Sequence, residues 1–121
     1  MRSLWALRIV LLLHCVLICA QPILAGYFLA GEVDAMNIHG PIGGSIWMLG
    51  FLQVFIAAIY WLCGGGGAQP VLWSMALVAA EFIQLIFGYL QNFAVHIPLG
   101  TAIVGTVIWM TVWSFRQEVK R

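Results

Sequence analysis

Four long apolar segments dominate the sequence, at about residues 5–30, 39–62, 70–91 and 95–115. A helix rises about 1.5 Å per residue, so about 20 residues cross the hydrocarbon core of a bilayer. Because lipid offers the backbone no hydrogen-bond partners, such segments are helical by default. The sequence therefore predicts an all-α membrane protein, a bundle of four transmembrane helices.

The composition supports a membrane protein and excludes a nucleic-acid partner. Of the 121 residues, 64% are hydrophobic and 7% are charged, whereas a soluble domain is about half apolar and about a quarter charged. Binding to phosphates needs a concentrated patch of Lys and Arg, but this chain has only five basic residues and a formal net charge of +1. The expected partner is the lipid bilayer.

The first apolar segment also looks like a secretory signal peptide, because basic residues precede an apolar stretch that ends in a small residue. Apolar character continues to Ala30, however, which gives the segment the length of a membrane span. This length favours an uncleaved first helix.

The charged residues predict the orientation of the chain in the membrane. The loop after the first helix contains only acidic charges, Glu32 and Asp34, whereas the basic residues lie near the two ends of the chain: Arg2, Arg8, Arg116, Lys120 and Arg121. Basic residues near spans favour the cytoplasmic side. We therefore expect both termini and the Gly64–Gly67 run on the inner side, in a bacterial cytoplasmic membrane.

An internal repeat links the two halves of the chain. Gly26-Tyr-Phe-Leu precedes His39-Gly-Pro-Ile-Gly-Gly-Ser-Ile46, and Gly88-Tyr-Leu-Gln precedes His96-Ile-Pro-Leu-Gly-Thr-Ala-Ile103. This repeat predicts a single transmembrane domain, residues 1–121, built from two tandem helical hairpins at about 5–62 and 70–115, with a glycine-rich connector at about 64–69. The hairpins should be related by a pseudo-two-fold axis along the membrane normal. That symmetry places His39 and His96 at one depth, facing each other near the outer surface.

Two histidines that face each other across a helical bundle are a common way to hold a heme between its axial positions. Gly43 and Gly100 each follow a histidine by four residues, so they share its helix face and leave clearance for a porphyrin. The sequence predicts a b-type heme whose iron is bound by His39 and His96.

Two other interpretations of the repeated motif remain open. Pro41 and Pro98 suit a first helical turn, so His-x-Pro is also explained as a duplicated helix-start signal. A paired-histidine metal site without heme is less favoured, because the only carboxylates at a matching depth are those of the first loop.

His14 and Glu81 lie at similar depths within the first and third spans, and ionisable groups there are expensive to bury. A pair between them is a structural bond, a part of a second site or a proton path, and the structural bond is favoured because polar pairs often join membrane helices. Gln21, Gln53 and Gln84 are candidates to extend the same network.

These motifs resemble those of a group of small four-helix bacterial membrane proteins of uncharacterised function, and one half of heme A synthase. The resemblance is carried by Gln21-Pro-Ile-Leu-Ala-Gly26 with Ile38-His39-Gly-Pro-Ile-Gly43, and by Gln84-Leu-Ile-Phe-Gly88 with Val95-His96-Ile-Pro-Leu-Gly100. It implies a four-helix bundle in which His39 and His96 hold a heme. Met36 and Phe93 stand where the reactive half of that family has a glutamate, and Gly40 and Ile97 stand where it commonly has an arginine after the histidine.

Heme with both axial positions filled has no open site for oxygen. The expected function is therefore electron transfer or heme handling near the outer leaflet, by an electron carrier or heme binder rather than a catalyst, alone or beside a larger membrane or redox complex. The alternative is a cofactor-free accessory or scaffold subunit of such a complex. A small transporter or channel is less favoured, because the spans have few charges to line a pore.

Overall fold

The structure is a computed structural model that describes residues 2–118. Within them the chain forms four helices, α1 (Arg2–Leu29), α2 (Ala35–Leu62), α3 (Gln69–Tyr89) and α4 (Phe93–Arg116). All four are long and apolar enough to cross a membrane, which confirms the predicted all-α architecture. The basic residues Lys120 and Arg121 lie outside the described residues.

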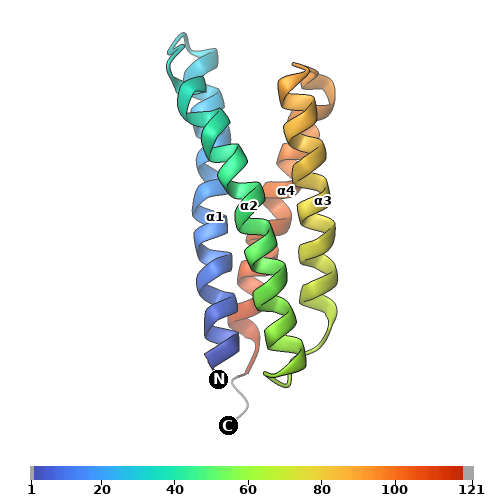
Figure 1. The fold of residues 1–121 in the computed structure, drawn as a ribbon. Coiled ribbons are helices and arrows are strands. Elements are labelled where there is room, and N and C mark those ends of the chain that lie inside the picture. The colour runs from blue at the N-terminus through green and yellow to red at the C-terminus, as the bar shows by residue number, and fades with distance from the viewer. Residues whose placement is uncertain (1, 119–121) are drawn as a thin grey trace.

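Consecutive helices run in alternating directions along one axis (Figure 1). Each helix packs on two others, α1 on α2 and α4, and α3 on α2 and α4. The diagonal partners are therefore α1 with α3 and α2 with α4. We call the end that contains residues 63–68 the connector end, and the opposite end, with residues 30–34 and 90–92, the loop end (Figure 1).

The connector between α2 and α3 matches its prediction. Pro70 lies in the first turn of α3, where its missing N–H breaks no helical hydrogen bond. Gly65 has a φ of +71°, a left-handed conformation that glycine adopts at little energetic cost. The glycine run thus ends one helix and reverses the chain before the next.

The helices α2 and α4 begin earlier than the sequence indicates. They start at Ala35 and Phe93, so Pro41 and Pro98 lie beyond the first helical turn, on exposed positions. A proline there removes one backbone hydrogen bond, but its ring faces outward and the helix continues through it. The interpretation of His-x-Pro as a helix-start signal is therefore wrong, and both histidines lie within regular helix.

Close packing is confined to the connector end and the middle of the bundle. The buried apolar side chains extend along the helices as far as Ile18, Ile46 and Ile103. Among the described residues nearer the loop end, only Ala35 is buried. The pair α1 and α2 also diverges from the pair α3 and α4 toward that end (Figure 1).

Hydrogen bonds from Arg8 join α1 to the end of α4. Its side chain is buried, and it donates hydrogen bonds to the carbonyl oxygens of Ser114 (3.1 Å) and Gln117 (2.8 Å). The guanidinium also lies over the rings of Trp5 and Phe115. The last carbonyls of a helix lack partners within the helix and carry partial negative charge, so a cation at this position stabilises the C-terminus of α4.

Arg8→Met should lower the free energy of unfolding in detergent by about 2 kcal/mol, because charge-assisted hydrogen bonds to buried carbonyls are lost. The matched change Arg2→Met, at an exposed arginine of the same helix, should alter it by less than about 0.5 kcal/mol. Equal effects of the two variants, measured by thermal or denaturant unfolding, would contradict this role for Arg8.

Candidate functional site

The structure brings His39 of α2 and His96 of α4 together across the diagonal of the bundle, at the loop end. Their ring centroids are 6.2 Å apart, and the ring planes are tilted by 57°. Both residues are half-buried. The two copies of the repeated motif therefore meet at one place in the structure.

Each histidine is held by a backbone carbonyl of the helix that precedes it in the chain. Nδ1–H of His39 donates to the carbonyl oxygen of Gln21 (3.2 Å), and Nδ1–H of His96 donates to that of Gln84 (3.0 Å). Because a carbonyl oxygen only accepts, Nδ1 must carry the proton in both rings. In the neutral imidazole, Nε2 then keeps its lone pair, which is the state of a metal ligand.

The distance between the rings matches two imidazoles on opposite sides of one metal ion. Ring nitrogens bound about 2 Å from a shared ion put the ring centres about 6 Å apart, and the observed separation is 6.2 Å. Within residues 2–118 neither Nε2 atom has a hydrogen-bond partner. Two neutral imidazoles at this spacing could therefore ligate one metal ion between them.

The two glycines of the motif face glutamine side chains. A Cβ atom on Gly100 would lie 2.6 Å from Nε2 of Gln84, and one on Gly43 would lie 4.0 Å from Oε1 of Gln21. Both glutamine side chains carry a buried polar atom without a partner, Nε2 of Gln21 and Oε1 of Gln84. Among residues 2–118, the region beside the histidines thus contains one buried polar atom without a partner on each of these two glutamines.

His14 and Glu81 form a second polar cluster, in the middle of the bundle. Nε2 of His14 lies 2.6 Å from Oε1 of Glu81, and both side chains are buried. This contact joins α1 and α3 across the other diagonal. The pairing predicted from their depths is therefore present.

The cluster continues into α2 and back to α3. Nδ1 of His14 lies 2.8 Å from Oε1 of Gln53, and Nε2 of Gln53 donates to the hydroxyl of Ser74 (3.0 Å). We refer to His14, Gln53, Ser74 and Glu81 as the core network. Ser74 was not identified from the sequence, since a serine in an apolar span has no signal of its own. Gln21 and Gln84 do not join this network.

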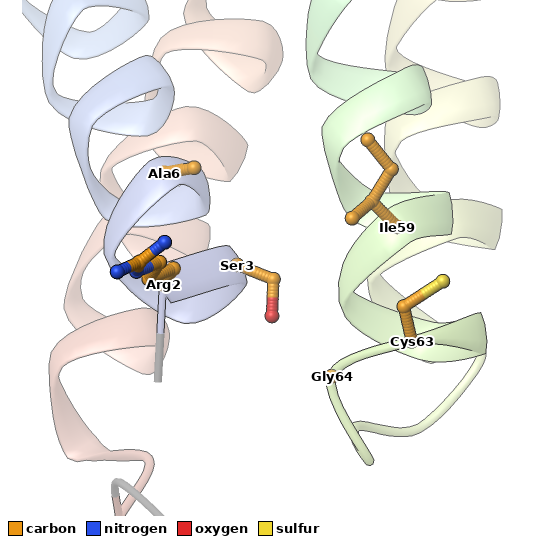
Figure 2. Close-up of a pocket in the computed structure, with 6 residues that line it drawn as sticks. All are labelled: Arg2, Ser3, Ala6, Ile59, Cys63 and Gly64. Atoms are coloured by element: carbon orange, nitrogen blue, oxygen red, sulfur yellow. The ribbon is translucent and has the colours of Figure 1, made fainter.

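The described part of the chain contains no larger cluster of metal-binding side chains, and it contains a cavity. No group of three or more His, Cys, Asp or Glu side chains there could hold a metal ion. A cavity of about 460 Å³ lies at the connector end between α1 and α2, and Ser3 points across it toward Gly64 (Figure 2). Its other lining residues are Arg2, Ala6, Ile59 and Cys63, a set with no recognisable catalytic arrangement.

Comparisons with protein families, curated proteins and solved structures found no match. The site is therefore interpreted from its own geometry.

Gly88→Ala should displace the ring of His96, because the new Cβ would lie 2.9 Å from its Cε1 atom. The matched change is Gly26→Ala in the first repeat, where a Cβ would meet nothing within 4 Å. The histidine ring resonances in NMR spectra should shift for His96 in Gly88→Ala, and for neither histidine in Gly26→Ala. Unchanged His96 resonances in Gly88→Ala would contradict this packing.

The contact between His14 and Glu81 should appear as a coupling energy of about 1–2 kcal/mol in a double-mutant cycle of unfolding. His14→Leu and Glu81→Leu each leave a buried polar partner unpaired, whereas the double variant removes both partners. Its loss of stability should therefore be smaller than the sum of the two single losses. Additive losses would indicate that the pair does not interact directly.

Proposed function

We propose that this chain is a membrane protein that binds one b-type heme through His39 and His96 and serves electron transfer or heme handling. The observation that carries the proposal is the shared geometry of the two histidines. Both donate Nδ1–H to a backbone carbonyl at about 3 Å, and their rings are 6.2 Å apart. A fixed tautomer with a free Nε2 on each side is what axial ligation of one iron requires.

The surroundings of the histidines fit a large flat group. Side chains of the described residues are mostly exposed or half-buried at this end. Gly43 and Gly100 add no side chain of their own, and the space beside them is occupied by Leu85, Gln21 and Gln84, which would have to move aside for a porphyrin to approach the backbone. Within the described part of the chain, Nε2 of Gln21 and Oε1 of Gln84 are buried and lack partners, and unsatisfied buried polar groups are rare in complete structures. A ligand that reaches this region would give them one.

The acidic groups of a heme would have to be bound at the loop end by neutral donors. The described residues of this end include no Lys or Arg. Asn37 is engaged with Asp34 at 3.3 Å, which leaves Gln91, Asn92 and the N–H groups at the start of α4. Helix N-termini favour anions, so the carboxylates would be held by helix dipole and amide groups.

We infer that the two hairpins are related by a pseudo-two-fold axis along the membrane normal. The support is that corresponding helices make corresponding contacts, α2 to α1 through His39 and α4 to α3 through His96. We also infer that the connector end faces the cytoplasm. Arg2, Arg8 and Arg116 lie there, while Glu32 and Asp34 lie at the loop end.

A bound heme would supply one-electron chemistry at the iron. The protein's part is to fill both axial positions, to fix the rings through the carbonyls of Gln21 and Gln84, and to surround the group with apolar helices. With no open axial position, electron transfer or heme handling is favoured over reactions with oxygen. A site near one membrane surface would exchange electrons with a partner at that surface.

The absorption spectrum of the protein purified in mild detergent after expression with added heme tests this function. The wild type should show a Soret band and, after dithionite, sharp α and β bands of low-spin heme. His39→Ala and His96→Ala should each lose the low-spin bands, and added imidazole should restore them by replacing the missing ring. Low-spin bands that survive in both variants would refute the ligand assignment.

His14→Ala is the matched control, because it removes the remaining histidine of the chain from the core network rather than from the heme site. Its spectrum should keep the low-spin bands. A colourless wild-type preparation would exclude heme binding and leave a cofactor-free accessory subunit as the better interpretation.

A further inference from the structure

We propose that His14 and Glu81 form a proton-binding site that binds its proton more tightly when the heme is reduced than when the heme is oxidised. The proposal rests on the heme function proposed above. It gives the core network a role in the redox reaction in addition to its structural one, and four features of the structure support it.

The first feature is the hydrogen-bond pattern around His14, which fixes its protonation on one side. Gln53 donates its Nε2 to the hydroxyl of Ser74, so its Oε1 faces Nδ1 of His14. An amide oxygen only accepts, and Nδ1 must therefore carry a proton. The remaining exchangeable proton lies on the 2.6 Å contact between Nε2 of His14 and Oε1 of Glu81.

The second feature is the charge of the pair in its two states. With the shared proton, the pair is neutral overall, whichever of the two atoms carries it. Without it, a carboxylate and a neutral imidazole remain, with a net charge of −1 in the apolar core. The other oxygen of Glu81, Oε2, is buried and has no partner, so nothing besides His14 stabilises that charge. The pair therefore keeps its proton until a positive charge arises nearby.

The third feature is the absence of competing charges among the described residues. The nearest cation, Arg8, lies six residues away on α1, about 9 Å along the helix, and it is bound to carbonyl oxygens at the end of α4. The other titratable groups of the four helices are few. They are Cys15 and Cys19 beside the pair on α1, Tyr60 on α2, Arg2, Tyr27, Tyr89 and Arg116 near helix ends, and the two candidate ligands.

The fourth feature is the distance from the pair to the heme site. The carbonyl that holds His96 belongs to Gln84, three residues beyond Glu81, or about 4.5 Å along α3. On α1 the buried Ile18 lies between His14 and Gln21, and on α2 the buried Ile46 lies between His39 and Gln53. The pair would therefore act on the heme through charge, without touching its ligands.

The charge of the heme affects the proton affinity of the His14–Glu81 pair, because both lie in the same apolar bundle. The iron and porphyrin ring carry one net positive charge in the ferric state and none in the ferrous state. The ferric state therefore favours the deprotonated pair, and the ferrous state favours the protonated pair. Each electron from an external one-electron donor is then accompanied by net binding of part of a proton from solvent, at most about half a proton for a tenfold change in affinity, between Nε2 of His14 and Oε1 of Glu81.

The size of the effect follows from Coulomb's law. His14 lies seven residues from Gln21 on α1, a rise of about 10 Å. Unit charges at about this separation, at an effective dielectric constant of about 20, change an equilibrium constant about tenfold. The proton affinity of the pair should therefore be about tenfold higher when the heme is ferrous. By linkage, the midpoint potential of the heme falls as pH rises, by up to about 59 mV over the range in which the pair loses its proton.

The test is a spectroelectrochemical titration of the purified holoprotein over a range of pH values. The wild-type potential should fall with rising pH, whereas in Glu81→Gln, which is neutral at every pH, this dependence should be lost. The pH dependence of the potential should also be lost in His14→Gln, because an isolated buried carboxyl group keeps its proton. This second variant provides the test if the first does not assemble. Glu32→Gln, which neutralises an exposed glutamate at the loop end, is the control and should keep the wild-type dependence.

Each outcome has a separate meaning. A wild-type potential that is independent of pH overturns the proton site, as does a wild-type slope that persists in the Glu81 and His14 variants. In both cases the heme spectrum is present and the proposed function stands. A preparation without heme overturns the proposed function and this inference together.

Discussion

Hydrocarbon supplies no hydrogen-bond partners, and this constraint explains where the polar side chains of the bundle lie. Polar contacts join the helices at three levels, among others. Arg8 joins α1 to the end of α4, His14 joins α1 to α2 and α3, and the two candidate ligands join α2 to α1 and α4 to α3. Each contact pairs a side chain with a group on another helix. The polar residues therefore set how the apolar helices sit against each other.

The density of side-chain packing also changes along the bundle. The connector end and the middle have a continuous apolar core, which ends one to three turns beyond the His14 contact. The loop end has the histidine pair but almost no buried side chains among the described residues. Binding sites are commonly found in the less stable parts of a structure. Under the proposed function, the packed half would hold the helices of the two candidate ligands in place while the less packed half binds the heme.

The sequence predicts the features that depend on length, composition and repetition. Four spans follow from four apolar runs, and the approach of His39 to His96 follows from the repeated motif. The pairing of His14 with Glu81 follows from the constant rise of a helix. The helix starts were misplaced, because the apolar segments begin at about residues 39 and 95, whereas the helices already begin at Ala35 and Phe93. The carbonyls of Gln21 and Gln84 were missed because a backbone acceptor leaves no mark in the sequence. The helices are also apolar on every face, so the sequence pattern does not predict which side of each helix faces the bundle. For this reason the sequence did not show that Gln53 joins the core network and that Gln21 and Gln84 do not.

The central claim is that one iron is shared by two imidazoles, one from each half of the chain. Electron paramagnetic resonance of the oxidised holoprotein, together with its heme content, measures this most directly. The geometry predicts one heme per chain and a single low-spin ferric signal typical of two imidazole ligands. A wild-type protein with a high-spin ferric signal, or with heme bound in no fixed ratio to the chain, would contradict it.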